Sequence, residues 1–129
     1  MPKILVVADE AWVRNEVHAA ITGTDFVLID HDDPTTVSQT AIELEIDAVV
    51  VDLQIKAMGG MAVTRSLRDA TGAGNNAGIP VVMLLDRTAD SFLARRAGAA
   101  AWVTKPFTSH DLGIALATAT GAAADVGSE

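Results

Sequence analysis

The stretch Ala48-Val49-Val50-Val51-Asp52 decides the fold of this chain. Its four apolar residues do not alternate with polar ones, which is typical of a strand that is covered on both faces. Such a strand belongs at the centre of a parallel sheet, because helices from the connecting segments cover both of its sides. The run stops abruptly at Asp52, so a carboxylate is expected at the carboxyl end of the central strand.

Four more short apolar runs predict further strands, and the segments between the runs carry apolar residues at helical spacing. Strands are expected at 4–7, 26–29, 48–51, 81–85 and 101–104, and helices at about 10–21, 34–45, 60–71, 88–97 and 109–119. Three of these helices have expected caps at their start: Asp33 for 34–45, Thr88 or Asp90 for 88–97, and Ser109 for 109–119. Gly98 is expected to end the helix at 88–97. This alternation predicts an α/β fold: a doubly wound, five-stranded parallel sheet with helices on both faces.

Length and composition restrict the class of protein. The chain has 129 residues, of which 50% are hydrophobic, so one domain with a buried core is expected and disorder is excluded over most of the chain. The domain is expected over 1–120, followed by a flexible tail over 121–129. With 17 acidic and 9 basic residues the formal net charge is -8, which repels a phosphate backbone, so no nucleic-acid partner is expected.

The chain contains no cysteine, which excludes disulfides, a thiolate nucleophile and cysteine-bound metals. No apolar run approaches the roughly 20 residues that span a bilayer. The N-terminal run breaks at Asp9, which is too early for a signal peptide. A cytoplasmic location without membrane contact is therefore expected.

Charged residues follow several of the predicted strands, at the end of a parallel sheet where ligands bind. Asp9 and Glu10 follow the first strand, Asp52 the third, Asp86 the fourth and Lys105 the fifth. Carboxylate oxygens suit Mg²⁺, and a lysine beside them suits a phosphoryl group. One aspartate after a strand is more often a turn residue. The convergence of several charges instead favours a phosphoryl-transfer site with Asp52 as the nucleophile.

Short motifs at 3–10, 47–53, 58–60, 80–84 and 98–107 together resemble the receiver domain of bacterial two-component response regulators. The resemblance covers about residues 3–118 and implies a flavodoxin-like strand order of 2-1-3-4-5. It also implies that Asp52 is the phosphoacceptor and that Lys105 contacts the phosphoryl group, with a cis peptide bond before Pro106. Asp9, Asp52 and the carbonyl of Gln54 are the implied Mg²⁺ ligands.

Three positions of the predicted pocket depart from the family's usual pattern. Ala8 stands where a second acid is usual, so weakened Mg²⁺ binding is expected. Leu85 replaces a threonine or serine, whose hydrogen bond to a charged oxygen contributes about 1.5–3 kcal/mol. Asp86 replaces a small residue and either narrows the access to Asp52 or supplies the missing acid. Glu10 is not expected to replace that acid, because successive side chains leaving a strand point in different directions.

Leu85 and Trp102 occupy the two positions that form the family's conformational switch. The aromatic ring normally moves inward after the hydroxyl is displaced, and Leu85 has no hydroxyl to displace. Simple packing of Trp102 over the last strand and helix is therefore the expectation.

Two functions remain open at this point. One is a stand-alone receiver domain that is phosphorylated by a histidine kinase or another phosphodonor and signals to a downstream protein partner or as a homodimer. The other is an interaction module that works without phosphorylation. A turnover enzyme is not expected, because no phosphate-binding Gly-x-x-x-x-Gly-Lys follows a strand and Gln54 stands where an aspartyl phosphatase needs its second acid.

Overall fold

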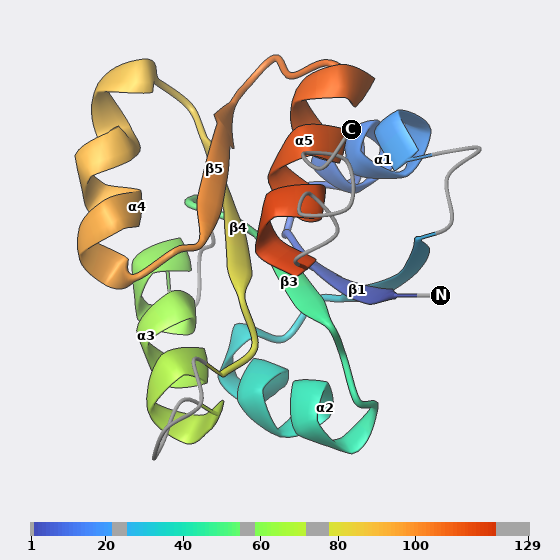
Figure 1. Cartoon of the computed structure of the whole chain (residues 1–129), viewed down its shortest axis with the longest axis vertical. Coiled ribbons are helices and arrows are strands. Elements are labelled where there is room, and N and C mark those ends of the chain that lie inside the picture. The colour runs from blue at the N-terminus through green and yellow to red at the C-terminus, as the bar shows by residue number, and fades with distance from the viewer. Residues whose placement is uncertain (1, 22–25, 55–58, 72–77, 121–129) are drawn as a thin grey trace, which may run out of the picture.

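The computed structural model describes residues 2–21, 26–54, 59–71 and 78–120 (Figure 1). Residues 121–129, for which a flexible tail is expected, lie outside the described residues, and so does Met58 of the third motif. None of the helices in the described ranges combines the length and the apolar character that a bilayer crossing requires.

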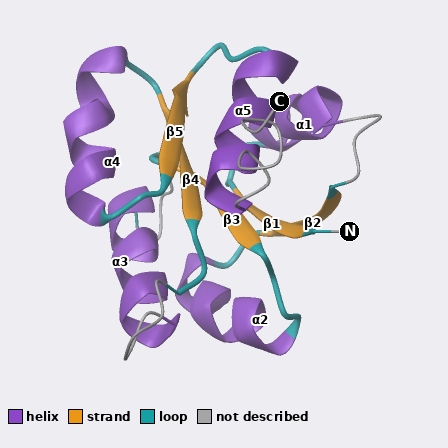
Figure 2. Ribbon diagram, in the orientation of Figure 1, coloured by secondary structure: helices purple, strands orange, loops and turns teal. Residues whose placement is uncertain are grey.

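Five parallel strands form one sheet in the order β2-β1-β3-β4-β5, which confirms the predicted fold class (Figure 2). The strands are β1 Lys3–Val7, β2 Val27–His31, β3 Ala48–Asp52, β4 Val81–Leu85 and β5 Ala101–Thr104. The helices are α1 Ala11–Ile21, α2 Val37–Glu43, α3 Gly60–Thr71, α4 Ser91–Ala97 and α5 Ser109–Thr120.

Two apolar clusters, one on each face of the sheet, hold these layers together. Alternate residues of β3 belong to different clusters: Val49 and Val51 to the one that α2, α3 and α4 cover, and Val50 to the one that α1 and α5 cover (Figure 1). Every residue of β3 is buried, as its unbroken apolar sequence predicts. Each fully buried valine or leucine contributes roughly 1.5–3 kcal/mol, so β3 and β4, whose residues are all buried, are firmly anchored in the sheet.

Several element bounds differ from the sequence prediction, and the differences in three elements have a clear local cause. The first helix begins at Ala11, because the carbonyl of Glu10 already accepts hydrogen bonds from the N–H groups of that helix. Strand β2 runs from Val27 through His31, since its pairing with β1 continues past the apolar run. The second helix is a 3₁₀ turn at Pro34–Thr36 followed by α2, which ends at Glu43.

Two of the predicted helix ends are confirmed. The Asp33 carboxylate accepts a hydrogen bond from the N–H of Thr35 at 3.0 Å, as expected of a cap. Gly98 ends α4 with φ 92°, a left-handed conformation that glycine adopts without a steric penalty.

Of the other two predicted caps, one is only partly right and one is wrong. Asp90 is the N-cap residue of α4, as one of the two alternatives predicted, but its carboxylate accepts from the Arg87 guanidinium at 3.0 Å and makes no capping hydrogen bond, while Thr88 begins the 3₁₀ turn before the helix. The cap of α5 is Thr108 and not Ser109, because the Thr108 hydroxyl accepts from the N–H of Asp111 at 3.0 Å. The sequence cannot show which of two neighbouring capping residues is the N-cap, since the choice depends on the conformation of the turn that precedes the helix.

Candidate functional site

The strand registers bring the predicted charges to one edge of the sheet. Val7 of β1 pairs with Val51 of β3, so Asp9 and Asp52 both follow at the carboxyl edge. On the other side of β3, Asp52 pairs with Leu84 of β4, and Asp86 follows that strand at the same edge.

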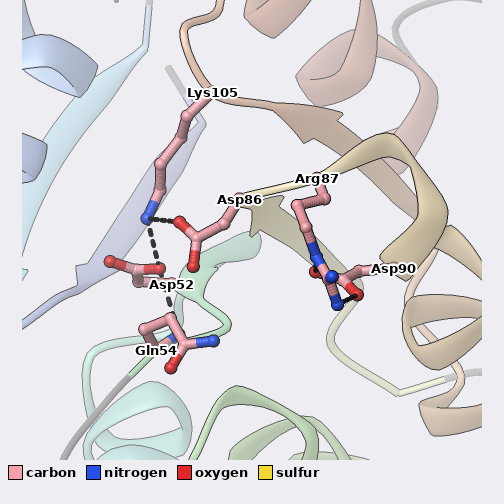
Figure 3. Close-up of polar contacts among 6 residues, drawn as sticks. All are labelled: Asp52, Gln54, Asp86, Arg87, Asp90 and Lys105. Atoms are coloured by element: carbon pink, nitrogen blue, oxygen red, sulfur yellow. Dashed lines mark hydrogen bonds and ion pairs between the residues drawn. The ribbon is translucent and has the colours of Figure 1, made fainter.

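Asp52 is the last residue of β3 and only 1% exposed. Its Oδ1 accepts hydrogen bonds from Lys105 Nζ at 2.7 Å and from the backbone N–H of Gln54 at 3.1 Å (Figure 3). A buried carboxylate is costly unless it is paired and hydrogen-bonded, and Asp52 is both. Its orientation is thereby fixed.

Lys105 reaches this carboxylate from beyond β5, and its side chain is 11% exposed. The backbone N–H of Lys105 donates to the carbonyl of Leu85 at 2.7 Å, and a cis peptide bond to Pro106 follows, as the resemblance implies. Burial by itself would lower the pKa of Lys105. The hydrogen bonds and negative charges of Asp52 and Asp86 outweigh burial, so the pKa is raised and the ammonium stays charged at neutral pH.

Asp86 also binds Lys105. Its Oδ1 lies 2.9 Å from Lys105 Nζ, and its side chain is 41% exposed (Figure 3). Two carboxylates from adjacent strands thus share a single ammonium group. On a further side of the same ammonium, the centroid of the Trp12 ring lies 5.6 Å from Nζ.

The turn after β1 is fixed by Arg14, whose guanidinium donates to the carbonyl of Ala8 at 2.6 Å and to that of Asp9 at 3.1 Å. Ala8 is buried in the apolar cluster beneath α1 and α5. Glu10 is exposed, and its carbonyl begins α1. Within the described segments, no three His, Asp or Glu side chains are grouped closely enough to hold a metal ion.

The donor chemistry at this edge still fits Mg²⁺. Magnesium keeps several waters and is held in proteins by one or two carboxylates with additional oxygens. Asp9, Asp52 and the carbonyl of Gln54 would supply such oxygens, and a set of this size needs no third acidic side chain.

The two residues that the resemblance assigns to a conformational switch lie on the α4 side of the sheet. Leu85 is fully buried in the apolar cluster there, and the half-buried ring of Trp102 packs against the same cluster. The Arg95 guanidinium of α4 lies 5.6 Å from the centroid of that ring. Trp102 therefore packs toward α4, and the prediction that it packs over the last strand and helix is wrong about the helix.

The sequence predicted that Trp12 lies beside the acidic site as a surface-packing residue, but sequence reasoning missed its contact with Lys105 and missed Arg14 entirely. The signal was present in their spacing: both lie within the first two turns of a helix that begins at the same edge as Asp9. The contact of Trp12 with Lys105 and that of Arg14 with the turn after β1 could not be deduced from sequence, because each side chain can adopt several rotamers.

The family of this chain follows from comparison with known protein families. The pattern of the response regulator receiver domain family matches residues 4–117 of the chain. The chain belongs to this family. It is therefore a receiver domain of two-component signalling, and receiver domains exchange signals with histidine kinases and downstream effectors.

Two curated relatives show the same relation at low identity. The chain is 32% identical over 112 residues to the DNA-binding response regulator MtrA of Mycobacterium tuberculosis, covering 85% of this chain and 46% of MtrA. It is 26% identical over 113 residues to the aerobic respiration control protein ArcA of Escherichia coli, covering 88% of this chain and 46% of ArcA. The chain spans about half the length of these relatives.

Solved structures of receiver domains share the fold. A receiver domain protein from Clostridium thermocellum superposes with a TM-score of 0.80 at 23% identity, covering 98% of this chain and 99% of that one. The receiver domain of the sensor histidine kinase PA1611 from Pseudomonas aeruginosa, solved with magnesium in its active-site cleft, gives a TM-score of 0.77 at 22% identity, covering 93% and 98%. These likenesses confirm the receiver topology.

Proposed function

We propose that Asp52 is the phosphoacceptor of this receiver domain and that its phosphorylation is the input signal. The observation that supports the proposal most is the buried Asp52 carboxylate held 2.7 Å from Lys105 Nζ. The carboxylate is fixed in place, and the cation beside it, which is charged at neutral pH, is the group that an oxygen of the incoming phosphoryl group would bind.

The proposed reaction is an in-line displacement at phosphorus. An oxygen of Asp52 forms a bond to phosphorus, while the bond from phosphorus to the donor's nitrogen or oxygen breaks. The leaving group takes that electron pair and then a proton from water. Lys105 compensates negative charge on the transferred group. Asp9, Asp52 and the Gln54 carbonyl would hold Mg²⁺, which neutralises phosphoryl charge when bound.

A histidine kinase or a small phosphodonor is the proposed source of the phosphoryl group, and a protein partner or a second copy of the chain is the proposed recipient of the signal. The net charge of -8 supports a protein and not a nucleic acid as the direct partner of this domain.

Acetyl phosphate with Mg²⁺ tests the proposal directly. We expect intact-protein mass spectrometry to show the gain of one base-labile phosphoryl group, and Asp52→Asn to abolish it. Asp32→Asn is the matched control, because Asp32 is an exposed aspartate of the same charge at another place, and it should be labelled like the wild type. The absence of labelling at every Mg²⁺ concentration would instead favour a module that works without phosphorylation.

Restoring the missing acid should strengthen metal binding. We expect Ala8→Asp to bind Mg²⁺ about 10-fold more tightly, because an added carboxylate holds waters of the hydrated ion. Without Mg²⁺ the same variant should be less stable, since Ala8 is 1% exposed and packs among apolar residues.

Titration of tryptophan fluorescence with Mg²⁺ measures this difference, because Trp12 lies beside Lys105. Ala8→Asn controls for the size of the new side chain without its charge. Equal affinities for the Asp and Asn variants would show that charge at this position does not limit metal binding.

A further inference from the structure

The surroundings of the Lys105 ammonium suggest more than a resting phosphorylation site. An ammonium group has three N–H donors. One donates to Asp52 Oδ1 and one to Asp86 Oδ1, while the Trp12 ring lies on a further side. Because the lysine side chain is only 11% exposed, another anion has little access to its ammonium group.

We propose that Asp86 is an autoinhibitory group, whose carboxylate occupies the position on Lys105 Nζ that an oxygen of the transferred phosphoryl group needs. Phosphorylation of Asp52 then requires Asp86 to turn away into solvent. This inference rests on the proposed function of Asp52 and adds a control on its rate.

Burial distinguishes the two carboxylates that share the lysine. Asp52 is 1% exposed and also accepts a hydrogen bond from the N–H of Gln54, so its carboxylate stays beside Lys105. The Asp86 side chain is 41% exposed at the start of the segment that follows β4, so rotation about its Cα–Cβ bond carries it into water. Asp86 is therefore the ligand of Lys105 that can be displaced.

Charge adds to this competition. A carboxylate and a phosphoryl oxygen are both anionic acceptors, and they repel each other when both lie beside the same ammonium group. The neighbouring cation Arg87 compensates only a small part of this negative charge, because its guanidinium is paired with buried Asp90 at 3.0 Å and Asp86 is the smallest of the contributions that raise the pKa of Arg87. A partly exposed ion pair is weak, so the contact should slow phosphorylation and not prevent it.

The test compares initial rates of labelling by acetyl phosphate at saturating Mg²⁺. Asp86→Asn keeps the shape and removes the charge, whereas Asp86→Ala removes the competing oxygens as well. We expect both variants to be labelled about fivefold faster than the wild type, which corresponds to losing one partly exposed ion pair. Asp32→Asn makes the same change in net charge away from the site and should leave the rate unchanged.

Binding of beryllofluoride, a non-covalent phosphoryl analogue, provides a second measurement on the same variants and should tighten by a similar factor. Equal rates and affinities in wild type and both variants would overturn the autoinhibitory role while leaving Asp52 as the phosphoacceptor. If the two Asp86 variants are labelled more slowly and bind Mg²⁺ more weakly than the wild type, Asp86 supplies the missing acid. That result would also overturn the autoinhibitory role. No labelling of any variant would reject the proposed function and this inference together.

Discussion

Lys105→Met is expected to lower the free energy of unfolding at neutral pH by about 3 kcal/mol. Methionine fills similar space but removes the ammonium that pairs with buried Asp52, and an unpaired buried charge is strongly destabilising. Asp86 adds to the effect, because its Oδ1 lies within hydrogen-bond distance of the same nitrogen and the two carboxylates then face each other without a cation. Urea unfolding monitored by tryptophan fluorescence measures the change.

The control is the double variant Asp52→Asn with Lys105→Met, which removes both members of the buried pair. We expect it to recover most of the lost stability, because no unpaired charge remains in the interior. A double variant no more stable than Lys105→Met alone would mean that the cost comes from packing of the lysine stem and not from charge.

Gly60→Ala is expected to lower the free energy of unfolding by about 3 kcal/mol and Tm by roughly 10 °C. A Cβ atom at this position would lie 2.6 Å from the carbonyl oxygen of Asp52 and 2.7 Å from the Cα of Leu53. Both neighbours are backbone atoms, so no side-chain rotation relieves the overlap. Either α3 must move away or the end of β3 that carries Asp52 must shift.

Gly113→Ala is the matched control, since a Cβ atom there has no neighbour within 4 Å and the residue lies inside α5. That substitution should raise the free energy of unfolding by about 0.5–1 kcal/mol, because alanine favours the helix more than glycine does. Thermal unfolding of the two variants gives opposite shifts in Tm. A Gly60→Ala protein as stable as the wild type would contradict the close packing of α3 on β3.

The fold was largely predictable because its determinants are local. Unbroken apolar runs such as 48–51 and 81–85 identify strands buried on both faces, and the helical spacing between them identifies the crossovers. The bounds of β2 and the cap of α5 were not predictable. The end of β2 is set by pairing with β1, and the choice between Thr108 and Ser109 depends on the preceding turn.

The candidate site was predictable only in part. The positions of Asp9, Asp52 and Lys105 at one edge follow from where their strands end in a parallel sheet. That Asp86 shares the ammonium of Lys105 did not follow, because the sequence equally allowed a carboxylate that serves a metal ion. The place of Trp12 beside the same ammonium also depends on how α1 packs against the sheet.

By itself, the sequence determined a parallel α/β sheet with acids and a lysine at its carboxyl edge, because hydrophobic periodicity and strand ends are properties of neighbouring residues. Only the tertiary structure decided which of these charges pair. Lys105 lies 53 positions after Asp52 and 19 after Asp86, and contacts over such distances arise from strand register and the packing of helices on the sheet. The balance of charge around one buried ammonium is thus a property of the folded chain.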